Sequence, residues 1–228
     1  MKNLGNSHLV TENVRGGVKT SFYRRPKWGC KVYGVFTIYF FDGVKIMIYR
    51  KAEKIIETDR LLLRLFTESD AQDVTELCNN YNIYKSTLTL PYPYSLECAL
   101  SWIANHEQNF DLDRMYEFAV TDKHSGQLYG AIGISNHKPY KNGEIAYWIG
   151  EQYWGNGYGT EAAKAVIEFV FTEKNYHRVY ARYLKSNPAS GKIMEKCGMT
   201  YEGTLKDHVY KNDTFEDLVY YGIINPMK

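Results

Sequence analysis

Hydrophobic and polar positions repeat with two different periods along the chain after residue 50. Arg60–Phe66 is a short apolar run, which predicts a strand. Thr67 and the acidic residues after it favour a helix start, and the helix is predicted to end near Cys78. Ser95 is typical of the residue before a helix, so a second helix is predicted over Leu96–Asn109.

The middle of the chain predicts three consecutive strands and then one long helix. A His-Ser-Gly turn and an Asn-Gly turn separate the strands, which are expected at 115–121, 127–135 and 144–149. The helix follows residue 159 and runs to about residue 174. Its predicted polar stripe is Glu161, Lys164, Glu168 and Thr172, and its predicted apolar face is Ala162, Ala163, Val166, Phe169 and Val170.

The last third predicts a strand over 178–184, a short helix over Pro188–Cys197 and two final strands near 201–210 and 214–224. Gly198 is in the usual position to end that helix. The predicted order is β-α-α-β-β-β-α-β-α-β-β. Neighbouring strands without helices between them argue against a doubly wound sheet. The pattern predicts an α+β fold, a mixed sheet with helices packed on it.

Residues 1–50 differ from the rest in charge. The 228 residues carry a net charge of +2, but residues 1–50 hold nine Lys/Arg and two Asp/Glu. The rest holds 19 basic and 24 acidic residues, which argues against nucleic acid as a partner. We therefore expect one domain over 51–228 and an extension over 1–50 that lies outside it, either poorly ordered or upstream of a translation start at Met47.

The most apolar run, Val32–Tyr49, contains Asp42 and Lys45. Each charge at mid-helix costs about 3 kcal/mol on membrane insertion, so no membrane partner is expected. The four cysteines form no C-x-x-C pair and have no histidine at metal-ligand spacing. We expect reduced thiols, no metal and a cytoplasmic protein.

The strongest local signal is a glycine-rich loop between a predicted strand and a predicted helix, Trp154-Gly-Asn-Gly-Tyr-Gly159. Glycines let backbone amides approach an anion, and a helix N-terminus adds free N–H groups, so the unit is suited to a pyrophosphate. A P-loop would need Gly-Lys-Ser/Thr, and a dinucleotide loop would need glycine at Thr160. On these residues alone, a tight turn without a ligand stays open.

Several further segments occur in register with this loop and make the chain similar to the GNAT superfamily, in its RimJ/RimL-like branch. The resemblance covers about residues 55–225, and residues 1–50 match nothing in the family. It implies a GNAT-type mixed, mostly antiparallel sheet flanked by helices, and acetyl-CoA as acetyl donor. The matching segments are IETDRLLLR (56–64), LPYPY (90–94), YWIG (147–150), YWGNGYGTEA (153–162), NPAS (187–190), EKCGM (195–199) and EG (202–203).

The resemblance also implies which residues bind coenzyme A. Asn187 and Ser190 match a family motif along the pantetheine arm, and Asn187 before Pro188 is also a good helix cap. A main-chain donor for the reacting carbonyl is implied near Trp148 and Ile149. The main-chain amides implied to hold the pyrophosphate belong to Trp154, Gly155, Asn156, Gly157, Tyr158, Gly159 and Thr160.

Acetyl transfer needs a neutral amine and a proton for the leaving thiolate. Glu144 is the first candidate base, because it begins the strand that leads to the loop; a solvated strand-end carboxylate is the alternative. Many relatives place a Tyr acid where this chain has Met194. Ser190 is the nearest replacement, and Tyr201 is a weaker one.

Other reactive or aromatic residues have two readings each. Cys197 reads as a buried thiol rather than a nucleophile, and His137 and His177 read as surface histidines. Tyr92 and Tyr94 either contact the acceptor substrate or plug the edge of the domain.

The sequence therefore predicts an acetyl-CoA-dependent N-acetyltransferase that acts on a primary amine by direct attack within a ternary complex. A protein N-terminal α-amine is the favoured acceptor, and a small-molecule amine is an alternative. A non-catalytic acyl-CoA sensor is the alternative of a different class. A homodimer is compatible with the resemblance.

Overall fold

The structure is a computed structural model that describes residues 28–33, 36–41 and 44–226. In those residues eleven strands form one sheet, which is antiparallel except for one parallel pair, β8 and β9. The predicted mixed, mostly antiparallel sheet flanked by helices is confirmed. In sheet order the strands are β1 (Trp28–Tyr33), β2 (Phe36–Phe41), β3 (Val44–Arg50), β4 (Ile55–Glu57), β5 (Leu61–Arg64), β6 (Met115–Asp122), β7 (Leu128–Ser135), β8 (Asn142–Ile149), β9 (Arg178–Leu184), β11 (Thr214–Ile224) and β10 (Thr200–Lys211).

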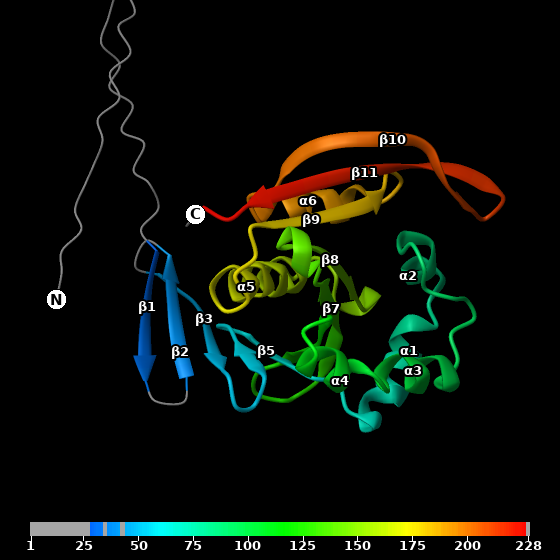
Figure 1. The fold of residues 1–228 in the computed structure, drawn as a ribbon. Coiled ribbons are helices and arrows are strands. Elements are labelled where there is room, and N and C mark those ends of the chain that lie inside the picture. The colour runs from blue at the N-terminus through cyan, green and yellow to red at the C-terminus, as the bar shows by residue number, and fades with distance from the viewer. Residues whose placement is uncertain (1–27, 34–35, 42–43, 227–228) are drawn as a thin grey trace, which may run out of the picture.

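Helices cover both faces of this sheet (Figure 1). One buried cluster joins the sheet to the longest helix, and a second joins it to two helices from the first half of the chain. No helix in the described part of the chain is long and apolar enough to cross a membrane. The helices are α1 (Ala71–Cys78), α2 (Tyr81–Ser86), α3 (Leu96–Ile103), α4 (His106–Asp111), α5 (Tyr158–Thr172) and α6 (Pro188–Lys196), with 3-10 turns at Glu68–Asp70, Lys138–Tyr140 and Glu151–Tyr153.

The two sheet faces are called here the α5 face and the α1 face. Ile132, Ile145 and Ile149 pack with α5, whereas Ala131 and Trp148 pack with α1 and α3. Because side chains alternate along a strand, residues 115–120 of β6, 130–135 of β7 and 144–149 of β8 divide between the two faces, and a bulge shifts the start of β7. The α1 face is therefore the face that carries Glu117, Gly133, Glu144 and Ala146.

The helices between β5 and β6 differ from the prediction. The single helix expected over 96–109 is two helices, because Asn105 leaves helical geometry with φ −109° and ψ 3°. Helix α2 was not predicted. Its cap is Asn80, whose side chain accepts hydrogen bonds from the backbone N–H of Asn82 and Ile83.

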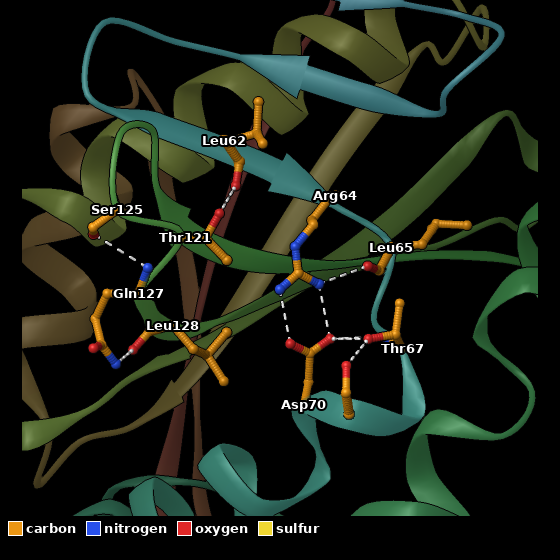
Figure 2. A network of polar contacts seen from close by, with 10 residues as sticks. Leu62, Arg64, Leu65, Thr67, Asp70, Thr121, Ser125, Gln127 and Leu128 are labelled. Carbon is orange, nitrogen blue, oxygen red and sulfur yellow. Dashed lines mark hydrogen bonds and ion pairs between the residues drawn. The ribbon is translucent and has the colours of Figure 1, made fainter.

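The connection from β5 to α1 contains the helix start that was predicted at Thr67 (Figure 2). The Thr67 N–H donates to Asp70 Oδ2 at 2.7 Å, as expected of a capping residue. Arg64 donates to both carboxylate oxygens of Asp70, at 2.8 and 2.7 Å. This bidentate pair ties the last residue of β5 to the turn before α1 and so fixes α1 against the sheet.

The predicted polar stripe of α5 is wrong at Glu168, which is 2% exposed. Lys164 on the same stripe is exposed, as predicted. Helix α5 contacts β3, β4, β5, β7, β8 and α6, so more than one of its sides is buried. Burial raises the pKa of Glu168 to about 8.

The packed body begins before the predicted boundary at residue 51. Strand β3 pairs with β4, and Met47 and Tyr49 are 0% and 4% exposed in the main core. Tyr49 packs on Phe169 of α5, with ring centroids 4.8 Å apart. Residues 1–27 lie outside the described residues, so the predicted order of that part, and the predicted start at Met47, stay predictions.

Candidate active site

Strands β8 and β9 pair only at their beginnings. Their parallel register covers Asn142 with Arg178, Gly143 with Val179 and Glu144 with Tyr180, and then stops. Beyond it, residues 145–149 of β8 pair only with β7, and residues 181–184 of β9 pair only with β11. We call this unpaired stretch the splay. It leaves an open backbone edge in the middle of the sheet, where a ligand can pair with main-chain groups.

Strand alternation identifies which main-chain groups face the splay. The Gly150 N–H donates to the Tyr129 carbonyl of β7 at 2.8 Å. Counting back along β8, Trp148 and Ala146 also direct their N–H and C=O groups at β7. The N–H groups of Ile149 and Tyr147 therefore face the splay. Of the predicted pair, Ile149 rather than Trp148 can offer a main-chain donor there.

The predicted strand–loop–helix unit is present directly after β8. Gly155 and Gly157 have φ of +79° and +81°, a region that favours glycine. The first N–H groups of α5, from Tyr158 to Thr160, have no partner within the helix and are open to an anion. Gly159 is buried, and a side chain there would come within 3.1 Å of Ile193 on α6. The loop is therefore shaped to bring free amides close to a ligand.

Arg60, which the sequence reasoning missed, lies against this loop. Its guanidinium donates to the Asn156 carbonyl at 3.0 Å and to Glu161 at 2.7 Å. It also lies over the Tyr158 ring at 4.8 Å from the centroid. The loop thus has a cation next to it, contributed by the residue directly before β5.

The start of α6 borders the other side of the splay. Asn187 caps α6, and its Nδ2 donates to the Ser86 carbonyl at 3.1 Å. Tyr147 Oη lies 3.0 Å from both the carbonyl oxygen and the Oγ of Ser190. Burial raises the pKa of Tyr147 above its usual value. Ser190 and Tyr147 thus form a hydroxyl pair between β8 and α6. Tyr147 was not predicted, although alternation along β8 places it on the same face as Ile145 and Ile149.

Glu144, the predicted candidate base, lies near the start of β8, where β8 and β9 part. Its Oε1 accepts from Arg182 Nε of β9 at 2.6 Å. The carboxylate is half-buried and is therefore partnered, not simply solvated. Arg182 was not predicted, because only the parallel register brings β9 beside Glu144.

Helix α2 contacts segments on both sides of the splay. On one side Asn80 and Asn82 donate to Glu151, in the turn after β8, at 2.7 and 2.8 Å. On the other side Ser86 accepts from Asn187. The β10–β11 turn also reaches α2 (Figure 1), because Lys211 Nζ donates to the Thr87 carbonyl at 2.5 Å.

The remaining candidates lie in less suitable places. Tyr92 is 47% exposed and belongs to a ring cluster with Tyr81 and Tyr84, whereas Tyr94 is buried in the second core cluster. Met194 is buried, and Tyr201 is exposed on β10. Burial raises the pKa of Cys197 to about 12, which is typical of an inert thiol. His137 and His177 are exposed.

The described residues fit acetyl-CoA. Loop amides and Arg60 suit a pyrophosphate, the open edge of β8 suits the amide-bearing pantetheine arm, and Glu144 stands on the α1 face of the splay. Among the described residues, no group of three or more His, Cys, Asp or Glu side chains is arranged to hold a metal ion.

Comparison with known proteins agrees with this geometry. The sequence profile of the Acetyltransferase (GNAT) domain matches residues 60–200. YnaD of Bacillus subtilis, an uncharacterized N-acetyltransferase, is 31% identical over 169 residues, which are 74% of this chain and 96% of the relative. The ribosomal protein uS5 alanine N-acetyltransferase of Escherichia coli is 26% identical over 184 residues, 75% of this chain and 91% of the relative.

Solved structures share the fold. A GNAT family acetyltransferase from Bacillus anthracis is 26% identical with a TM-score of 0.67, covering 75% of this chain and 98% of that one. RimL, solved with coenzyme A, is 20% identical with a TM-score of 0.71, covering 76% and 99%. The chain belongs to the GNAT acetyltransferase family, and the predicted RimJ/RimL-like resemblance is confirmed. It is a GNAT-type N-acetyltransferase, in a family whose acetyl donor is acetyl-CoA.

Proposed function

We propose that this protein transfers the acetyl group of acetyl-CoA to the N-terminal α-amine of a protein, by direct attack within a ternary complex. The observation that carries the proposal is the junction of the splay with the Gly loop at the end of β8. This junction offers amides for a diphosphate and an open strand edge leading to Glu144. The name of the uS5 alanine N-acetyltransferase supports an α-amine as the acceptor class.

The proposed chemistry uses residues on both sides of β8. Glu144 attracts the incoming ammonium and takes or passes on its proton. The amine nitrogen then bonds to the thioester carbonyl carbon, and the Ile149 N–H stabilises the charge on the carbonyl oxygen. As the C–S bond breaks, the thiolate takes a proton from the Ser190–Tyr147 hydroxyl pair, and the second proton that the nitrogen loses on forming the amide returns to that pair through water.

A thiol-release assay with acetyl-CoA tests the acceptor class. The amines are octapeptides that begin with Ala, Ser or Met, the same peptides with a blocked N-terminus and one lysine, spermidine and kanamycin. The proposal expects turnover with free N-terminal peptides only. Turnover with spermidine or kanamycin alone would make the protein a small-amine acetyltransferase. Binding of CoA without turnover of any amine would make it an acyl-CoA sensor.

Calorimetry with CoA and acetyl-CoA tests the cofactor site separately. Glu144→Gln is expected to keep CoA affinity and to lower turnover about 100-fold, the size expected for a lost proton acceptor. Unchanged turnover would remove Glu144 from the chemistry. A folded protein that ignores both ligands at millimolar concentration would end the proposal.

A further inference from the structure

Glu117 of β6 and His106 of α4 are buried together on the α1 face. They are 9% and 2% exposed. His106 Nε2 lies 3.1 Å from Glu117 Oε2, but the contact is not aligned as a hydrogen bond. Both ring nitrogens of His106 lack a hydrogen-bond partner within the described part of the chain. A buried imidazole without partners costs free energy, so stability alone does not account for this pair.

Aromatic rings link the pair to β8. His106 packs edge-on against Trp102, at 4.5 Å between ring centroids, and against Phe66, at 5.4 Å. Trp102 in turn lies 6.4 Å from Trp148 of β8. The rings keep the pair in an apolar layer that extends to the strand bordering the splay.

A row of small residues connects Glu117 with the splay. Glu117 pairs with Gly133, and Gly133 pairs with Ala146 of β8. A side chain at position 133 would come within 3.0 Å of Glu117 Cγ, so the glycine makes room for the glutamate over β7. Ala146 is exposed and stands at the edge where β8 has left β9. Gly133 itself is buried, with Met115 Cε 3.5 Å from the same position, so Ala146 is the residue of this row that is open at the splay.

The charges around the pair suit proton transfer near neutral pH. Burial raises the pKa of Glu117 to about 7, opposed by a hydrogen bond from Trp102 of α3. Burial lowers the pKa of His106 to about 4, so its ring is neutral. Elsewhere on the α1 face, the titratable groups on neighbouring elements are the Glu144–Arg182 ion pair of β8 and β9 and the buried Cys78 thiol of α1. Glu117 is thus a carboxyl without a cationic partner, whereas Glu144 already binds Arg182.

We infer that Glu117 and His106 form a proton-accepting pair that receives the proton of the acceptor amine through solvent water at the exposed Ala146. The inference rests on the proposed function and names the destination of the proton that Glu144 attracts. Before the N–C bond forms, the ammonium gives this proton through water to the Glu117 carboxylate, and the neutral amine that results attacks the thioester as the C–S bond breaks. The resulting carboxyl lies beside the neutral His106 ring and returns its proton to solvent after the product leaves.

The test is the pH profile of kcat with the N-terminal octapeptide that is acetylated fastest. The wild-type profile is expected to rise with an apparent pKa near 7. Glu117→Gln keeps the side-chain shape and is expected to lose that limb, with kcat about 100-fold lower at pH 7.5 and KM changed less than threefold. His106→Phe, which keeps a ring beside Trp102, is expected to shift the limb.

Glu168→Gln is the matched control. Glu168 is also a buried carboxyl with a raised pKa, but it lies on α5, against the opposite sheet face. Its variant is expected to keep the wild-type kcat and profile, and thermal melts at pH 6 and 8 show that each variant is folded. A Glu117→Gln profile equal to wild type, or an equal loss in both variants, would overturn the inference and leave the proposed function standing. A wild-type protein that binds CoA but acetylates no peptide would end both.

Discussion

Glu168 carries a cost that depends on pH. Its carboxyl is 2% exposed, Oε1 has no hydrogen-bond partner among the described residues, and burial raises its pKa from 4.5 to about 8. The folded state therefore holds the proton more tightly than the unfolded state. Stability linked to this proton is fully present below pH 4.5 and is lost as the pH rises to about 8.

Glu168→Gln is accordingly expected to stabilise the protein at pH 8 and not at pH 4.5. Wild type should lose about 4 kcal/mol of unfolding free energy, relative to the variant, between these two pH values. Urea unfolding at each pH measures the difference. Parallel pH dependence in the two proteins would show that the carboxyl reaches water.

Among the described residues, the cation that contacts the Gly loop is Arg60, through the Asn156 carbonyl and the Tyr158 ring. Arg60→Leu should weaken CoA binding about tenfold, because a charge-assisted contact to the diphosphate is lost. Arg60→Lys should give an intermediate loss, since it keeps the charge but not the guanidinium fork. Calorimetry measures both, with Lys138→Gln as a control, because Lys138 is exposed in the turn before β8, at the opposite end of that strand from the Gly loop. If the wild type, both Arg60 variants and the control bind CoA with equal affinity, Arg60 does not contact the diphosphate and only holds the loop in place.

The sequence supplied those site residues that lie close together along the chain. The Gly loop, Asn187, Ser190 and the position of Glu144 follow from local patterns and from the family resemblance. Arg60, Arg182 and the Glu117–His106 pair do not, because each acts through a neighbour on another strand or helix. Glu117 sits in an apolar strand pattern, and only the three-strand register reveals that its row leads to the splay.

Helix α2 is a short element that depends on contacts from three others. Lys211 Nζ lies 4.2 Å from the centroid of the Tyr84 ring and 2.7 Å from the Tyr84 carbonyl. Lys211→Met removes these contacts and should loosen α2 without unfolding the sheet. We expect amide exchange in residues 81–87 to rise about tenfold, while α5 stays protected.

Lys206→Met is the matched control for α2, because Lys206 is exposed on the same strand. Hydrogen exchange read by mass spectrometry compares the two variants. Equal exchange over 81–87 would mean that Asn187 and Glu151 hold α2 without the hairpin.

Helix α2 was not predicted because it has only six residues and little apolar periodicity. Helix α5 was predicted because its fifteen residues show a clear helical period.

The fold class, and the order of the strands from β5 onward, could be predicted because strand and helix periods there are distinct. The start of the packed body could not. The segment Val32–Tyr49 is apolar, but its sequence does not show which of its residues pack in the core. The change in charge near residue 50 led to a predicted boundary there. Packing of Met47 and Tyr49 against α5 depends on a surface formed more than a hundred residues later in the chain.

Two truncated chains test where the cooperative unit begins. A chain starting at Val44 keeps β3, and a chain starting at Lys51 loses it together with the buried side chains of Met47 and Tyr49. Removing two such core residues costs about 4 kcal/mol or more, so the shorter chain should melt about 10 °C below the longer one. Met47→Ala with Tyr49→Ala in the full chain should reproduce most of that loss, because the strand backbone remains. If the two truncated chains melt together, β3 adds nothing to the stability of the body, and the predicted boundary at residue 51 is the better description of the folded unit.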